Sequence, residues 1–144
     1  MIIVADTSAL YAAFDTAQPE HSGAAKILEN ETLAVSPLVV TELDHLVHRD
    51  LGFPATMQVM EALNSRMADG QYRLAELKPA DLAAAHDVRR DYEGLRLDLA
   101  DAVGVVLAHR YRTDRIFTLD QRDFRAVRPL TPGFTTFRIL PVDG

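Results

Sequence analysis

The chain has 144 residues, a formal net charge of −6 at pH 7, 48% hydrophobic residues and no cysteine. This length fits a single domain over residues 1–144, and the lack of cysteine excludes disulfides, thiolate metal sites and cysteine nucleophiles. No stretch approaches the roughly 18 apolar residues of a membrane helix, and the apolar start is too short for a signal peptide. We therefore expect a cytoplasmic protein with no membrane partner.

The first half of the chain alternates short apolar runs with amphipathic segments. The runs at residues 2–4 and 33–35 predict strands buried on both faces. Helices are expected at residues 9–14, 19–29, 37–51 and 54–67. The third helix has the strongest start signal, because Ser36 can cap it and Pro37 stands at its first position, while Gly52 ends it.

The second half continues the alternation. Strands are expected at residues 72–77, 115–119 and 135–140, and helices at 79–92 and 98–111. The helix at 98–111 is the most apolar in the chain. Strands alternating with helices predict a three-layer α/β/α sandwich around a mostly parallel sheet. Ligands of such folds bind beyond the carboxyl ends of the strands.

Four acidic residues stand where an ordinary fold would place apolar ones: Asp6, Glu42, Asp101 and Asp120. Asp6 and Asp120 each follow an expected strand, and Asp101 lies in the most apolar helix. A buried carboxylate must be neutralised, paired with a cation or bound to a metal. Since no lysine or arginine lies near Asp6 or Glu42 in sequence, a hard divalent cation such as Mg²⁺ or Mn²⁺ would satisfy the set.

Each acidic residue also has a purely structural interpretation. Asp6 can cap the helix that follows it, and Glu42 can be a solvated helix residue. Asp98 is well placed as an N-cap, with Asp101 three residues on in a capping-box-like pair. Asp120 and Asp123 can both be turn residues. The four together favour a site, because strand ends and helix starts meet at one edge of a sheet.

Histidine-based zinc chemistry is a weaker alternative. Glu42, His45 and His48 recur every three residues on one expected helix. Each three-residue step turns the side chain by about 60°, so that only neighbouring pairs face together. Helix packing and surface exposure explain these histidines better than a zinc site does.

Four motifs in order resemble the PIN domain, and most closely the VapC toxins of bacterial toxin–antitoxin pairs. The motifs are DTSAL at residues 6–10, SPLVVTEL at 36–43, LDLADA at 97–102 and TLDQRDF at 118–124. They span nearly the whole chain. Each motif is loose by itself, whereas the ordered set is specific to the family.

The resemblance implies an endoribonuclease with a Mg²⁺ site, in which Mn²⁺ can substitute. Carried over by motif, the catalytic and metal-binding quartet would be Asp6, Glu42, Asp101 and Asp120. Side chains that orient these ligands or bound waters would come from Thr7, Ser8 and Thr118, and Asp98 and Asp123 would be secondary site residues. A binding module for RNA or protein on the same fold, without catalysis, is the alternative.

The resemblance also implies partners: tRNA or ribosomal RNA as the substrate, a VapB-like antitoxin and a second copy of the chain in a homodimer. The expected helix at 54–67 offers Met57, Met60 and Met67 as adaptable apolar surface for either protein contact. Residues 86–144 carry 10 basic and 9 acidic residues, and every basic one is arginine, a residue suited to phosphate. The arginines that flank the last two motifs are candidates for RNA contact: Arg96, Arg112, Arg122, Arg125 and Arg128.

Overall fold

The computed structural model describes all residues from Met1 to Gly144 and shows one five-stranded sheet, in the order β3-β2-β1-β4-β5. All four strand pairs are parallel. The strands are β1 (Ile3–Ala5), β2 (Leu33–Val35), β3 (Tyr72–Leu74), β4 (Arg115–Phe117) and β5 (Arg138–Leu140). The first strand is therefore central, and every carboxyl end lies at the same edge of the sheet.

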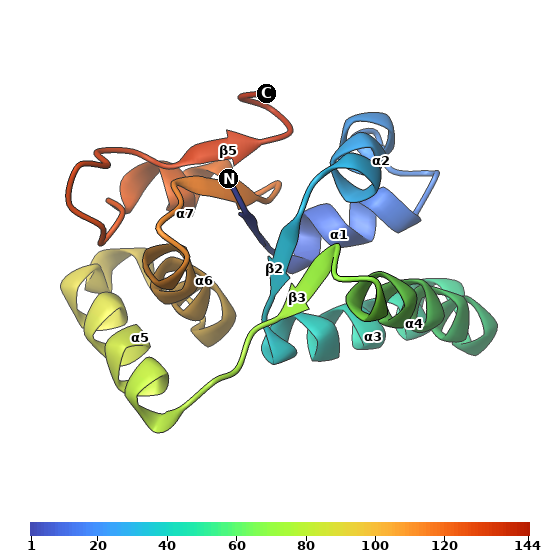
Figure 1. The fold of residues 1–144 in the computed structure, drawn as a ribbon, viewed down its shortest axis with the longest axis horizontal. Coiled ribbons are helices and arrows are strands. Elements are labelled where there is room, and N and C mark those ends of the chain that lie inside the picture. Colours follow the sequence, from blue (N-terminus) through green and yellow to red (C-terminus); the bar gives the residue numbers. More distant parts are fainter.

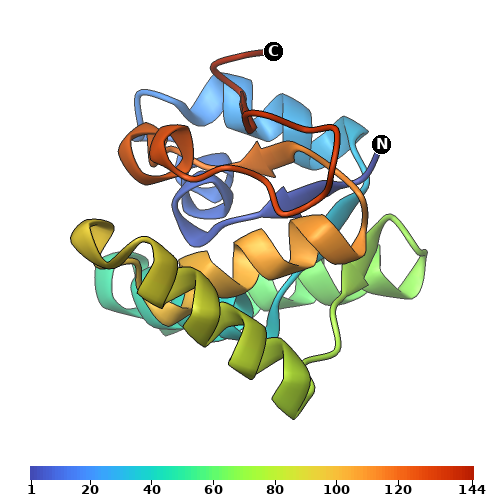
Figure 2. The same cartoon turned by 90° about the vertical axis from the view of Figure 1, so that its left-hand side faces the viewer.

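Helices cover both faces of the sheet (Figures 1 and 2). The helices are α1 (Thr7–Phe14), α2 (His21–Asn30), α3 (Pro37–Leu51), α4 (Phe53–Ala68), α5 (Pro79–Asp91), α6 (Leu99–Arg110) and α7 (Gln121–Ala126), with a 3-10 turn η1 (Glu93–Leu95) before α6. Helices α1 to α4 pack on one face and α5 to α7 on the other. None of them combines the length and the apolar character needed to cross a membrane.

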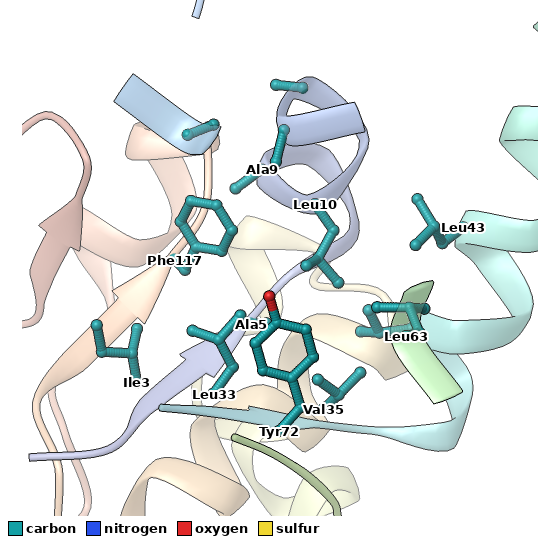
Figure 3. Close-up of a cluster of buried hydrophobic side chains, with 14 of the residues drawn as sticks. Ile3, Ala5, Ala9, Leu10, Leu33, Val35, Leu43, Leu63, Tyr72 and Phe117 are labelled. Atoms are coloured by element: carbon teal, nitrogen blue, oxygen red, sulfur yellow. The ribbon is translucent and has the colours of Figure 1, made fainter. Parts of the chain in front are cut away.

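Two hydrophobic clusters, one on each face, hold the layers together. Alternate residues of a strand point to opposite faces, so Ile3 and Ala5 enter the first cluster while Val4 enters the second. Neighbouring strands repeat this division. Figure 3 shows the first cluster, in which Leu10 of α1 and Leu43 of α3 lie over the sheet. The expected α/β/α sandwich is confirmed, and its sheet is parallel throughout.

The predicted elements are confirmed in type, with shifted ends. The strands expected at 72–77 and 135–140 shorten to three residues each, because each pairs with only one neighbour, itself three residues long. The helix expected from residue 19 begins at His21. Ser36 does cap α3, since its side chain accepts a hydrogen bond from the Leu38 amide at 3.1 Å. The prediction missed α7, which has six residues and is too short for a clear helical period.

Candidate metal centre

The four acidic residues singled out by the sequence converge on the carboxyl edge of the sheet. Asp6 directly follows β1, and Asp120 lies three residues beyond the end of β4, the strand next to β1. Glu42 arrives from the second turn of α3, and Asp101 arrives from the first turn of α6. Parallel pairing is what brings them together, because each crossover returns the chain so that strand ends and helix starts share one edge.

Three carboxylates form the tightest cluster. Asp101, Asp120 and Asp123 each present one oxygen, and these oxygens all lie within 4.8 Å of one another. All three residues are half-buried. None of them takes part in an ion pair with a basic side chain. Oxygens around one Mg²⁺ lie at most about 4.2 Å apart, from a metal–oxygen distance near 2.1 Å, so the three carboxylates stand within side-chain reach of a common ion.

The cluster also leaves one polar atom without a partner. The Oδ1 oxygen of Asp123 is buried and accepts no hydrogen bond. Buried polar atoms are nearly always satisfied, so an orphaned carboxylate oxygen marks a place for a cation or an ordered water. The oxygen-only donor set is the one that Mg²⁺ and Mn²⁺ prefer. The residues present therefore fit a hard divalent cation.

Electrostatic repulsion shapes the protonation of this cluster. Desolvation by burial and the nearby charges of Asp6 and Asp98 raise the pKa of Asp101 to about 8. Desolvation, followed by the charge of Asp120, raises the pKa of Asp123. Like charges that share a desolvated site favour the neutral form of one of them. A cation would reverse this preference, because it stabilises the charged carboxylates.

Two hydroxyls fix the orientation of Asp6. The Thr118 hydroxyl donates to Asp6 Oδ2 at 2.7 Å, and the Ser8 hydroxyl donates to the same oxygen at 3.2 Å. Backbone amides hold both hydroxyls in place, since Asp120 N donates to Thr118 Oγ1 and Leu119 N donates to Ser8 Oγ. Burial raises the pKa of Asp6, and the Thr118 hydrogen bond opposes that shift. These contacts tie the end of β1 to the end of β4.

Glu42 stands at one side of the tight cluster. The Thr7 hydroxyl donates to Glu42 Oε2 at 3.1 Å. Desolvation raises the pKa of Glu42, and the charges of Asp98 and Asp6 add to the rise. Glu42 therefore lies within electrostatic reach of both residues, although it is not part of the three-carboxylate cluster.

The structural roles considered for the aspartates divide between them. Asp98 caps α6, since its Oδ1 accepts from the Asp101 amide at 2.8 Å. Asp120 caps α7 by accepting from the Asp123 amide at 3.1 Å. Asp6 occupies the N-cap position of α1, but its side chain makes no capping bond. Asp120 is thus both a cap and a member of the cluster.

Asp123 is more central than the sequence suggested. It reaches the cluster because Asp120 is the N-cap of α7 and Asp123 lies in the first turn of that helix. A signal was present in the sequence: an aspartate followed three residues later by another acidic residue is the pattern of a capped helix start.

The arginines proposed for RNA contact have different surroundings. Arg96 and Arg122 are exposed next to site residues, and the charge of Arg122 partly opposes the rise in the pKa of Asp123 that desolvation causes. Arg125 instead forms two hydrogen bonds to Asp143, at 2.7 and 2.6 Å. Arg112 follows the end of α6, a 12-residue helix that starts at the metal centre, which places it roughly 18 Å away along the helix axis. Arg128 is exposed, and its amide donates to the Tyr92 hydroxyl.

Comparison with known proteins agrees with this fold and identifies its family. Residues 3–129 match the family model of the PIN domain. Ribonuclease VapC26 of Mycobacterium tuberculosis is 40% identical over 141 residues, which cover 96% of this chain and 100% of that protein. The chain therefore belongs to the PIN-domain family and, within it, to the VapC ribonuclease toxins of toxin–antitoxin systems.

Solved structures share the fold at lower sequence identity. Mycobacterium tuberculosis VapC20, a sarcin–ricin loop cleaving toxin, superposes with a TM-score of 0.75 and 19% identity, covering 94% of this chain and 97% of that one. A toxin–antitoxin complex from Klebsiella pneumoniae gives a TM-score of 0.60 at 19% identity, over 87% and 92% of the two chains. VapBC2 of Rickettsia felis, bound to a DNA fragment from its promoter, gives 0.63 at 17% identity, over 88% and 93%.

Proposed function

We propose that this chain is an endoribonuclease that depends on Mg²⁺ or Mn²⁺ and hydrolyses phosphodiester bonds of structured RNA. The observation that carries the proposal is the cluster of Asp101, Asp120 and Asp123, whose oxygens lie within 4.8 Å of one another and pair with no basic side chain. RNA is a polyanion, and the carboxylates of this site would repel its phosphates. A cation bound among the carboxylates would make binding of the RNA favourable.

Asp101, Asp120 and Asp123 would hold the ion, with Asp6 beside them and Glu42 at the side of the site. A divalent ion bound there would lower the pKa of a coordinated water and stabilise charge on the phosphate. The hydroxyls of Ser8 and Thr118 orient Asp6 by binding its Oδ2 oxygen. The Thr7 hydroxyl does the same for Glu42. These positioning contacts hold the carboxylates in place against their mutual repulsion.

RNA would approach along the exposed side of the site, where Arg96 and Arg122 can bind phosphates on either side of the scissile bond. Arg125 is held by Asp143 and contributes to the fold instead. VapC20 is described as cleaving the sarcin–ricin loop, and we propose a structured RNA of this kind, tRNA or ribosomal RNA, as the substrate class. Proteins read such RNAs through their loops and unpaired bases.

The protein partners that we propose are a VapB-like antitoxin and a second copy of the chain in a homodimer. Two of the similar solved structures are toxin–antitoxin assemblies, which supports the antitoxin. Leu51, Phe53 and Met57 are exposed apolar side chains where α3 meets α4, and they offer surface for such contacts. Met60 and Met67 instead pack against the core.

The experiment is cleavage of purified total RNA by the protein freed of antitoxin, with Mg²⁺, with Mn²⁺ and with EDTA, and with new ends mapped by sequencing. The variant is Asp6→Asn, and its matched control is Asp44→Asn, an exposed aspartate on α3. Discrete cuts that need metal, that disappear in Asp6→Asn and that persist in Asp44→Asn are expected. If folded protein makes no cuts with either metal, the non-catalytic binding module becomes the better interpretation.

A further inference from the structure

A recess of about 300 Å³ opens beside the metal centre. It lies between the start of α2, the segment that joins β4 to α7, and the residues after β5. The recess, called here the Gln121 recess, is lined by Glu20, Gly23, Thr118, Leu119, Gln121, Pro141 and Val142. Its size is at the lower end of ligand pockets in general, which hold roughly 300–1,000 Å³.

The Gln121 recess is continuous with the catalytic edge. Thr118 forms part of its wall, and the hydroxyl of the same residue donates to Asp6 Oδ2. Gln121 is the residue directly after Asp120, at the first position of α7. A group of the RNA that is placed in the recess therefore lies next to the phosphate at the carboxylate cluster.

The lining favours a nucleobase over a phosphate. Leu119, Pro141 and Val142 supply apolar surface for the faces of a ring. The Thr118 hydroxyl is already engaged with Asp6, and the remaining polar side chains are the Glu20 carboxylate and the Gln121 amide, both exposed to solvent. Because the carboxylate repels phosphate and no basic side chain lines the recess, the RNA group that fits there is uncharged and carries hydrogen-bond donors.

We propose that the Gln121 recess binds an unpaired guanine next to the scissile phosphate and so selects where the RNA is cut. Among the RNA bases, guanine alone offers two adjacent N–H donors on its Watson–Crick edge, which one carboxylate can accept together. The Gln121 amide can donate to O6 on the same edge. Splayed bases read by their edges are the usual route to sequence-specific RNA recognition. This inference rests on the proposed nuclease function and deepens it.

The first test measures binding without cleavage. The four nucleoside 5′-monophosphates are titrated into ¹⁵N-labelled protein, and amide shifts are followed at Gly23, Leu119 and Val142. All four share the phosphate, so differences report the base. At equal concentration, guanosine monophosphate is expected to change the chemical shifts of these amides at least about fivefold more than the other three nucleotides do. Equal shifts for all four bases, or none at these amides, would overturn the proposal.

The second test blocks the recess. A Cβ atom added at Gly23 would lie 3.4 Å from the Pro141 ring, so Gly23→Leu fills the space between α2 and the C-terminal segment. Ser22→Leu is the control, because Ser22 is exposed on the same helix and lines no part of the recess. Cleavage of total RNA is expected to fall about tenfold or more in Gly23→Leu and to stay unchanged in the control. Melting curves with and without Mn²⁺ confirm that both proteins fold and bind metal.

A third variant keeps the proposal falsifiable if Gly23→Leu fails to fold. Glu20→Gln retains the shape of the side chain but removes the charge, and Glu29→Gln at the other end of α2 is its control. The fraction of mapped cuts that adjoin guanine is expected to fall severalfold in Glu20→Gln alone. An unchanged cut-site distribution would contradict the guanine subsite.

The two proposals fail in different ways. If wild-type protein cuts nothing while guanosine monophosphate still shifts the recess amides, the nuclease function fails and the base site stands. If Gly23→Leu cuts RNA normally but escapes inhibition by its antitoxin, the recess belongs to a protein contact and the RNA subsite is wrong.

Discussion

Two groups of carboxylates in this chain contrast with each other. Asp143, near the C-terminus, accepts two hydrogen bonds from Arg125 and one from the Ile139 amide, and these contacts lower its pKa to about 2. At the carboxyl edge of the sheet, Asp101 has no basic partner, and burial raises its pKa to about 8. The chain thus pairs the Asp143 carboxylate with an arginine and leaves the carboxylates at the edge of the sheet without a basic partner.

This contrast points to a functional role for the carboxylates that have no basic partner. Arginine is abundant in the second half of the chain, so pairing of the edge carboxylates was chemically available. Unpaired buried charges lower the free energy of unfolding, and they persist where function needs them. A divalent cation is the partner that would offset this cost while leaving coordination positions for RNA.

The largest expected effect comes from breaking the unpaired group. Asp101→Asn removes one charge from the centre of the cluster and is expected to lower the rate of RNA cleavage by at least about 100-fold, since loss of even a supporting residue of a metal site costs about 10–100-fold. The metal-free protein should not lose stability, because a repelled carboxylate is replaced by a neutral amide. Initial cleavage rates and thermal melts in EDTA measure both effects. A variant that cuts RNA at the wild-type rate would remove Asp101 from the site.

The next effect is stabilisation by the cation. Mg²⁺ or Mn²⁺ at 100 times its dissociation constant should raise the free energy of unfolding by about 2.7 kcal/mol. Asp123→Asn is expected to weaken this response, because Asp123 Oδ1 is the buried oxygen without a partner. Differential scanning fluorimetry over a metal titration measures this stabilisation in wild type and in Asp123→Asn, with Asp44→Asn as the control. An Asp123→Asn titration that matches wild type would place the ion elsewhere.

A smaller effect concerns pH. The folded pKa of Asp101 is raised above its unfolded value of about 3.9. Its contribution to stability is therefore fully present below about pH 4 and is lost as the pH rises towards 8. Because the residue is only half-buried, solvent screening limits the loss to on the order of 2 kcal/mol. Urea denaturation of metal-free protein between pH 5 and 8 should show this decline, and Asp101→Asn should flatten it; an equally steep decline in both proteins would contradict the assignment.

The positions of the edge carboxylates could be predicted from the sequence better than the Arg125–Asp143 pair could. Asp6 and Asp120 follow strands, and parallel strands must end at one edge, so their convergence follows from topology alone. Asp123 depended on α7, whose six residues are too few for a periodic signal. The Arg125–Asp143 pair joins residues 18 positions apart across two elements, and no local pattern specifies such a contact. For that reason the position of Arg125 beside a motif predicts an RNA contact, whereas the structure pairs its side chain with Asp143.

The smallest predicted effect tests the paired group. Asp143→Asn weakens the contact to Arg125 and is expected to lower the free energy of unfolding by about 1 kcal/mol at pH 7, since the pair is partly exposed and solvent screens it. The depressed pKa means that this stability is present above about pH 4 and disappears as the pH falls towards 2, so wild type and variant should converge in acid. Urea melts at pH 7 and pH 3 measure the difference. RNA cleavage at 25 °C should be unchanged, because Asp143 lines no part of the Gln121 recess and lies outside the cluster of Asp101, Asp120 and Asp123. A large loss of cleavage in a variant that remains folded would show that the two groups of carboxylates are coupled.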